Sequence, residues 1–180
     1  MTTFVFNGER QAVSAIPRAV LDSLLYYATR APDGAIVEVG VWKGGSALEL
    51  SKLGRPMFLY DTFSGIPYQG SLDLANPIGK FGDTSADAVR ALIPEATVVE
   101  GLFPDSIVEM PPVGFVHADA DQYESTRAIL EVLPPRMVRG GFILFDDFGV
   151  PGCEGCTHAV HESGRRFAVL SDTNRALVIV

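Results

Sequence analysis

Apolar residues along this chain follow two alternating periods. Helical spacing predicts helices at residues 16–31, 44–54, 84–94, 123–135 and, more briefly, 157–167. Short continuous apolar runs predict buried strands at residues 35–41, 56–61, 96–101, 113–119 and 141–147. The tail, residues 166–180, has two β-rich runs around Ser-Asp-Thr-Asn, which predicts a hairpin. Strand and helix therefore alternate through most of the chain.

Residues at the expected boundaries agree with this order. Pro17 suits the first turn of the first helix, Gly54 closes the second, and Thr84 or Ser85 can cap the third. Alternating strands and helices predict a doubly wound, mainly parallel α/β sheet. Five strands and the C-terminal antiparallel hairpin make a sheet of seven strands. Sheets of this Rossmann-like kind bind ligands beyond the carboxyl ends of their strands.

Composition narrows the class of protein further. With 180 residues, 47% of them hydrophobic, and no linker, we expect one domain over residues 1–180. No apolar run is long enough to span a membrane, and the first residues lack a signal-peptide pattern, so we expect a soluble, cytoplasmic protein without a membrane partner. The net charge of −8, without a cluster of Lys or Arg, argues against a nucleic-acid partner.

Two of the predicted strands end abruptly in pairs of carboxylates. Asp119 and Asp121 end the run GFVHADAD, and Asp146 and Asp147 end the run GGFILFDD. If the two strands are neighbours, these like charges need a cation between them or a shared proton. Mg²⁺ prefers oxygen ligands, so we expect Asp119, Asp146 and Asp147 to hold a magnesium ion. A hydroxyl bound there would give its proton to Asp119 or Asp121, the predicted catalytic pair.

The same part of the sequence also allows purely structural roles. Asp121 precedes a predicted helix and could cap it. His117 lies on the same strand face as Asp119 but deeper, which is typical of a core residue or of one that supports the site.

The stretch EVGVWKGGSA, residues 38–47, joins the first buried strand to a helix. Trp42 stands where a dinucleotide-binding turn needs its middle glycine, and Lys43 precedes the glycines where a P-loop needs Gly-Lys-Ser/Thr. Glu38 would repel phosphate but suits an ammonium group, and Asp61, at the end of the next strand, suits the hydroxyls of a ribose. Ribose and ammonium without pyrophosphate indicate S-adenosylmethionine. The alternative is that the glycines only turn the chain.

The only two cysteines, Cys153 and Cys156, form a C-x₂-C pair just before His158 and His161. The spacing crowds four ligands into one turn, so a zinc site is disfavoured against a loop cysteine and a helix cysteine with structural roles.

A different reaction class also uses paired aspartates. Haloacid-dehalogenase-type phosphatases carry a strand ending in D-x-D and another ending in D-D, and this chain has both. Their nucleophile lies on the first strand of the fold, and a Lys is expected between the two motifs. Between Asp121 and Asp146 this chain has only arginines as basic residues. A metal-dependent phosphohydrolase is therefore kept as the alternative.

The ordered motifs IVEVGVWKGGSALEL, YDTFSGIP, GDTSADAV, GLFPDSI, FVHADADQYESTRAILEVLPPRMVRGGFILFDDFG and GCTHAV cover residues from about 36 to about 160. Together they resemble the macrocin O-methyltransferase family, whose members methylate sugar hydroxyls of antibiotics. The resemblance implies a class I methyltransferase fold, S-adenosylmethionine as cofactor, and Mg²⁺ held by Asp119, Asp146 and Asp147. The acceptor would be a hydroxyl of a small molecule, a sugar or a phenol, and the base Asp119 or Asp121. The cofactor residues it implies are Glu38, Gly40, Gly44, Ser46 and Asp61, with Asp83 and Ser85 of the GDTS segment.

The chain departs from the family pattern in two places. Little precedes the first predicted helix, where relatives carry elements that cover the acceptor pocket. The last helix is brief and has His161 where an acidic residue is more usual. These departures leave three interpretations open: an exposed or large acceptor, a lid from a second subunit in a homo-oligomer, or a relic that only binds.

Overall fold

The computed structural model describes residues 3–170 and 173–180. Its main sheet has seven strands in the order β5-β4-β3-β6-β7-β9-β8. The strands are β3 (Ala35–Val39), β4 (Met57–Asp61), β5 (Thr97–Glu100), β6 (Val113–Ala118), β7 (Met137–Phe145), β8 (Phe167–Leu170) and β9 (Arg175–Ile179). β3 to β7 pair in parallel, and β9 is antiparallel to both neighbours. The predicted doubly wound sheet with its C-terminal antiparallel pair is confirmed, while Ser171 and Asp172 of the predicted turn lie outside the described residues.

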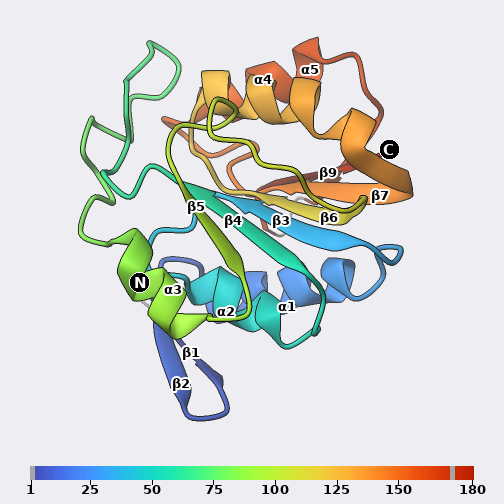
Figure 1. Cartoon of the computed structure of the whole chain (residues 1–180). Helices are drawn as coiled ribbons and strands as arrows, with labels where there is room; N and C mark the ends of the chain where they lie inside the picture. The colour runs from blue at the N-terminus through green and yellow to red at the C-terminus, as the bar shows by residue number, and fades with distance from the viewer. Residues whose placement is uncertain (1–2, 171–172) are drawn as a thin grey trace.

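The helices cover both faces of this sheet (Figure 1). They are α1 (Arg18–Ala28), α2 (Gly45–Ser51), α3 (Ala86–Leu92), α4 (Tyr123–Val132) and α5 (Glu154–Glu162), with a 3₁₀ turn η1 (Pro134–Arg136) before β7. Successive strand residues point to opposite faces, so Ile36 packs in the core with α1, α2 and α3, while Val37 packs with α4 and α5. Two apolar layers thus hold the strand ends in place.

Two predicted caps have different outcomes. The Ser85 side chain accepts a hydrogen bond from the backbone N–H of Ala88 and so caps α3, as expected. Asp121 does not cap α4, because the N-cap residue is Gln122 and Asp121 has a left-handed backbone with φ of 59°. The capping role considered for Asp121 is therefore wrong.

The N-terminal segment forms a hairpin that the sequence analysis missed. β1 (Thr3–Asn7) and β2 (Arg10–Ser14) pair antiparallel and pack against α2. In the sequence Phe-Val-Phe hides the alternation, since Phe4 and Phe6 are exposed while Val5 is buried. β2 and α2 approach each other closely at Gly45, because a Cβ atom there would lie 2.5 Å from Cβ of Ser14.

Strand order reverses between β3 and β6, since the chain passes from β3 to β4 on one side and reaches β6 on the other. Crevices open at such switch points, outside the carboxyl ends of the strands. Within the part of the chain that the structure describes, no helix is both long and apolar enough to cross a membrane.

Candidate active site

A cavity of about 270 Å³ lies beyond the carboxyl ends of β3, β4, β6 and β7. Its walls come from residues 14–17, the turn after β3, the start of the β4–α3 loop, residues 101–103, and the ends of β6 and β7. Seven residues predicted for the site line it: Gly40, Ser46, Asp61, Asp119, Asp121, Asp146 and Asp147. The glycine turn and both acidic pairs therefore face one space.

Glycine is required at the start of the turn after β3. Gly40 has φ of 89°, and a Cβ there would lie 1.7 Å from the backbone oxygen of Asp119. Asp61 fixes the rest of the turn. Its Oδ2 accepts hydrogen bonds from the backbone N–H groups of Val41 and Trp42 at 2.7 and 2.8 Å, and its Oδ1 accepts one from Phe63 at 2.7 Å. A carboxylate has about four acceptor positions, so a ligand diol must share Asp61 with these backbone donors.

The other four predicted cofactor residues do not line the cavity. Gly44 is the left-handed N-cap of α2, and Ser85 caps α3. Asp83 accepts hydrogen bonds from the Trp42 indole Nε1 at 2.7 Å and the Lys43 ammonium at 2.5 Å, and its side chain is 66% exposed. Glu38 is fully buried beneath the cavity floor. These residues support the walls rather than forming them.

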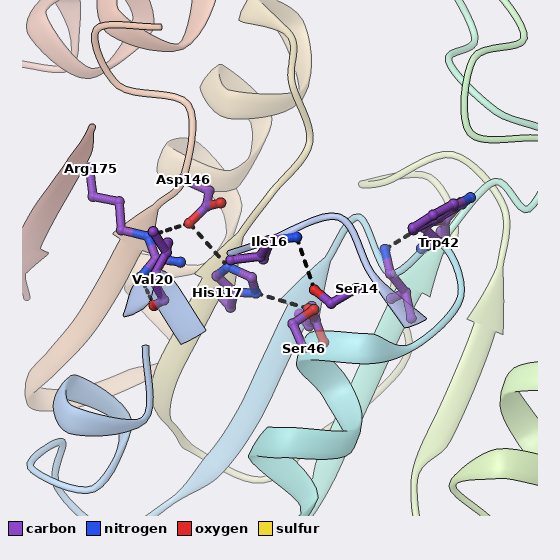
Figure 2. A network of polar contacts seen from close by, with 11 residues as sticks. Ser14, Ile16, Val20, Trp42, Ser46, His117, Asp146 and Arg175 are labelled. Carbon is purple, nitrogen blue, oxygen red and sulfur yellow. Dashed lines mark hydrogen bonds and ion pairs between the residues drawn. The ribbon is translucent and has the colours of Figure 1, made fainter. Parts of the chain in front are cut away.

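A buried polar chain runs under the cavity from α2 to β9 (Figure 2). Ser46 donates a hydrogen bond to Oε1 of Glu38, and the same oxygen lies 2.9 Å from Nδ1 of His117. His117 Nε2 lies 3.7 Å from Asp146 Oδ1, which also accepts a hydrogen bond from Arg175 Nε. Arg175 is fully buried. The chain thus alternates acid, base, acid and base.

These contacts set the charges of the buried chain. Burial alone lowers the pKa of His117, but the carboxylates of Asp146 and Glu38 outweigh it and raise that pKa to about 10. Burial opposes ionisation of Asp146, yet His117 and Arg175 together hold its pKa below the usual range. At neutral pH His117 is therefore an imidazolium paired with two carboxylates, and a protonated imidazole does not ligate a metal.

Among the residues described, the other three aspartates have no buried arginine beside them. Burial and the charge of Asp146 raise the pKa of Asp119 well above its usual range, and burial and the charge of Asp121 do the same for Asp147. Burial raises the pKa of Asp121 to about 6, against the opposing effects of Lys80 and a hydrogen bond from Asn76. This edge of the cavity therefore carries unbalanced negative charge whenever its carboxylates ionise.

Possible metal ligands fall into two groups in the described residues. Oxygens of Asp119 and Asp146 lie within 4.8 Å of each other and of a His117 ring nitrogen. Oxygens of Asp121 and Asp147 lie within the same distance of each other and of Cys153 Sγ. The predicted trio of Asp119, Asp146 and Asp147 is thus divided between two adjacent groups.

Cys153 and Cys156 are both buried and free. His161 packs against Phe148 and Phe167, with ring centroids 5.7 and 5.0 Å apart, and a joint Cys–His ligand group does not form among the residues described. The structural interpretation of these cysteines, favoured from the sequence, stays a prediction.

Sequence reasoning missed three contributors to the site. Arg175 had a usable signal, a charged residue at the start of the apolar run Ala-Leu-Val-Ile. Asn76, which donates a hydrogen bond to Asp121, lies in an irregular loop without such a signal. Residues 14–17 line the cavity only because the missed hairpin brings them there.

Solved structures define the fold class. The chain aligns with "Structure of the O-methyltransferase NovP" at a TM-score of 0.71 and 22% identity, covering 88% of this chain and 78% of that one. It aligns with an O-methyltransferase from Bacillus cereus in complex with SAH at a TM-score of 0.63 and 17% identity, covering 93% and 82%. The fold is that of the class I methyltransferases.

The sequence comparisons give the family. The model described as "Macrocin-O-methyltransferase (TylF)" matches residues 27–173, and the chain belongs to this family. A relative from Streptomyces olivaceus, "8-demethyl-8-(2,3-dimethoxy-alpha-L-rhamnosyl)-tetracenomycin-C 4'-O-methyltransferase", is 30% identical over 207 aligned positions, covering 93% of this chain and 78% of the relative. Alignments with two other curated relatives span 61% and 62% of those proteins.

Proposed function

We propose that this protein transfers a methyl group from S-adenosylmethionine to a hydroxyl of a sugar in a natural product. The observation that carries the proposal is the single cavity in which the turn held by Asp61 faces the aspartates of β6 and β7. A cofactor bound at the turn would present its methyl group toward a hydroxyl held at the acidic edge. Support for a sugar comes from the rhamnosyl group in the name of the Streptomyces olivaceus relative.

The acidic edge fits a magnesium ion. Asp119 and Asp146 offer the carboxylate oxygens that Mg²⁺ prefers, while Asp147 lies in the adjacent group with Asp121. The raised pKa of Asp119, caused by burial and the charge of Asp146, reflects a local excess of negative charge that a cation relieves. Arg175 occupies only Oδ1 of Asp146 and leaves Oδ2 for a ligand. When bound, Mg²⁺ would supply Lewis-acid chemistry that makes an acceptor hydroxyl more acidic.

Within the predicted pair we assign Asp121 as the general base, because Asp119 groups with Asp146 as a metal ligand while Asp121 lines the same cavity. Its pKa of about 6 lies near a neutral working pH, so its carboxylate is largely ionised and able to take a proton. The pKa of Asp119 lies well above its usual range, and in this proposal Asp119 binds the metal. S-adenosylmethionine would supply an electrophilic methyl group with a neutral thioether as its leaving group, and Asp121 would accept the proton of the acceptor hydroxyl.

The end of the N-terminal hairpin and the β4–α3 loop both contribute to the cavity wall. Residues 14–17 line the cavity, as do Gly65, Ile66 and Phe81 of that loop. A lid from a second subunit in a homo-oligomer stays a prediction. The cytoplasmic location and the lack of a nucleic-acid partner also stay predictions. Membership in a methyltransferase family removes the basis for the phosphohydrolase alternative.

The test combines binding with turnover. Calorimetric titration with S-adenosylhomocysteine, with and without Mg²⁺, should give binding in both cases, and Mg²⁺ should be required for methyl transfer to rhamnosyl and other glycoside acceptors. NADH should bind more weakly than S-adenosylhomocysteine. Cofactor binding without turnover on any glycoside or phenol would indicate a relic that only binds. Turnover unaffected by chelators would show that the reaction does not need a metal.

A further inference from the structure

The loop between β4 and α3, residues 62–85, is anchored across the acidic edge of the cavity. The Gln122 side chain donates a hydrogen bond to the backbone oxygen of Tyr68, and the hydroxyls of Tyr68 and Ser125 lie 3.1 Å apart. Asp73 is 1% exposed, and its Oδ2 accepts a hydrogen bond of 3.2 Å from the N–H of Tyr123, the first residue of α4. The loop is therefore held against the helix that follows the D-x-D motif.

At the centre of this contact lies Asn76, whose side chain is 2% exposed. Its Nδ2 donates to Asp121 Oδ1 at 2.6 Å and to Cys153 Sγ at 3.2 Å. Its Oδ1 accepts a hydrogen bond from Lys80 Nζ at 2.5 Å. An ammonium only donates and a carboxylate only accepts, so these partners fix which way the amide faces. Both polar atoms of the Asn76 side chain thus have hydrogen-bond partners.

We propose that Asn76 is a positioning residue that aims the carboxylate of Asp121 into the cavity. The backbone of Asp121 is already fixed, since φ is 59° and its N–H donates to Asp147 Oδ2 at 3.2 Å. What remains free is the torsion of the side chain, and the bond from Asn76 removes that freedom. Because a proton moves only between atoms in hydrogen-bond reach, a small rotation of a base is costly.

This inference rests on the proposed function, in which Asp121 is the general base. Asn76 does not line the cavity, so it acts through Asp121 and not on the acceptor itself. The same loop offers a matched control, Gln69, whose Nε2 donates to the backbone oxygen of Leu74 at 3.2 Å in an exposed position. Gln69→Ala removes a hydrogen bond of the loop that does not involve Asp121, so a loss confined to the Asn76 variants points to Asp121.

The kinetic test compares Asn76→Ala, Asn76→Asp and Gln69→Ala with the wild type. Asn76→Ala should lower kcat by about 10- to 100-fold, the range that a hydrogen bond to a charged group supports, with the dissociation constant of S-adenosylhomocysteine unchanged. Asn76→Asp keeps the size of the side chain but places a like charge against Asp121, so its kcat should fall at least as far. Gln69→Ala should keep the wild-type kcat. Wild-type kcat in Asn76→Ala, or equal losses in Asn76→Ala and Gln69→Ala, would overturn the proposal.

Crystal structures of the same variants separate this inference from the proposed function. In Asn76→Ala or Asn76→Asp the Asp121 side chain should leave its wild-type rotamer, while Asp119 and Asp146 keep theirs. If the wild type transfers no methyl group but Asp121 still rotates in these variants, the proposed function fails and the positioning role holds. If Asp121 keeps its rotamer in both variants, the positioning role fails whatever the activity is.

Discussion

The aspartates at the ends of β6 and β7 lie in two different electrostatic environments. Asp146 contacts the buried cations His117 and Arg175, and its pKa is held low although burial opposes this. The pKa of Asp147, the next residue, is raised by burial and by the charges of the other three aspartates. Asp146 and Asp147, adjacent in one sequence motif, thus lie among charges of opposite sign.

The difference separates two ways of tolerating a buried carboxylate. Where the fold supplies a cation, the carboxylate is ionised and fixed without a ligand. Where it does not, the carboxylate must hold a proton or recruit a cation from solution. The second kind creates the demand for Mg²⁺, whereas Asp146 is ionised before the metal binds and offers it the oxygen that Arg175 leaves free.

The largest expected effect is on stability, from Asp146→Asn compared with Asp147→Asn. Asp146→Asn leaves Arg175 buried without its counter-charge and should lower the free energy of unfolding by about 3–5 kcal/mol. Asp147→Asn removes only repulsion and should cost far less. Urea denaturation of the metal-free proteins measures both, and equal losses would mean that the two environments do not differ. In Asp146→Asn protein that folds, methyl transfer should be abolished while the affinity for S-adenosylhomocysteine stays nearly unchanged.

The next prediction concerns pH. Because the pKa of His117 is raised from 6.5 to about 10, the folded state holds this proton more tightly than the unfolded chain. The contribution of His117 to the free energy of unfolding is fully present below about pH 6.5 and is lost as pH rises through about 10. Unfolding of metal-free protein followed across this window should show a loss of a few kcal/mol. His117→Asn should flatten the curve there, and an unchanged slope would mean that His117 is not charged.

On the cofactor side of the cavity we compare Asp61 with Asp83. Asp61→Ala removes the acceptor for three backbone donors of the turn and should weaken binding of S-adenosylhomocysteine by about 1–3 kcal/mol. Asp83 is exposed and accepts its hydrogen bonds from the side chains of Trp42 and Lys43, so Asp83→Ala should change the affinity much less than Asp61→Ala. Calorimetry measures both, and a larger loss in Asp83→Ala would reverse the assignment.

The smallest effect is expected at Asp119. Without metal, Asp119→Asn relieves repulsion by Asp146 and should raise the free energy of unfolding by about 0.5–2 kcal/mol. Mg²⁺ should raise the melting temperature of the wild type and raise that of Asp119→Asn only weakly. The increase should be smaller at low pH, because protonated carboxylates are poor ligands. A wild type whose melting ignores Mg²⁺ would contradict the metal site.

Patterns with a short range along the chain were predictable. The seven strands, the glycine at position 40 and the placing of the four aspartates at neighbouring strand ends follow from period, turn chemistry and parallel pairing. The partners of those aspartates were not predictable. Arg175 reaches Asp146 from 29 positions away and Asn76 reaches Asp121 from 45, and local sequence contains no record of such contacts. The hairpin was missed because the exposed Phe4 and Phe6 imitate a buried run.

The thiol of Cys153 can be used as a chemical probe of the packing at the acidic edge. This thiol is buried and accepts a hydrogen bond from the amide of Asn76, so a reagent reaches the sulfur only when the packing around it opens. Burial also raises the pKa of this thiol to about 12, so little reactive thiolate forms until then. We therefore expect Cys153 to be labelled faster in Asn76→Ala than in the wild type, with Cys156, buried in α5, as the internal reference.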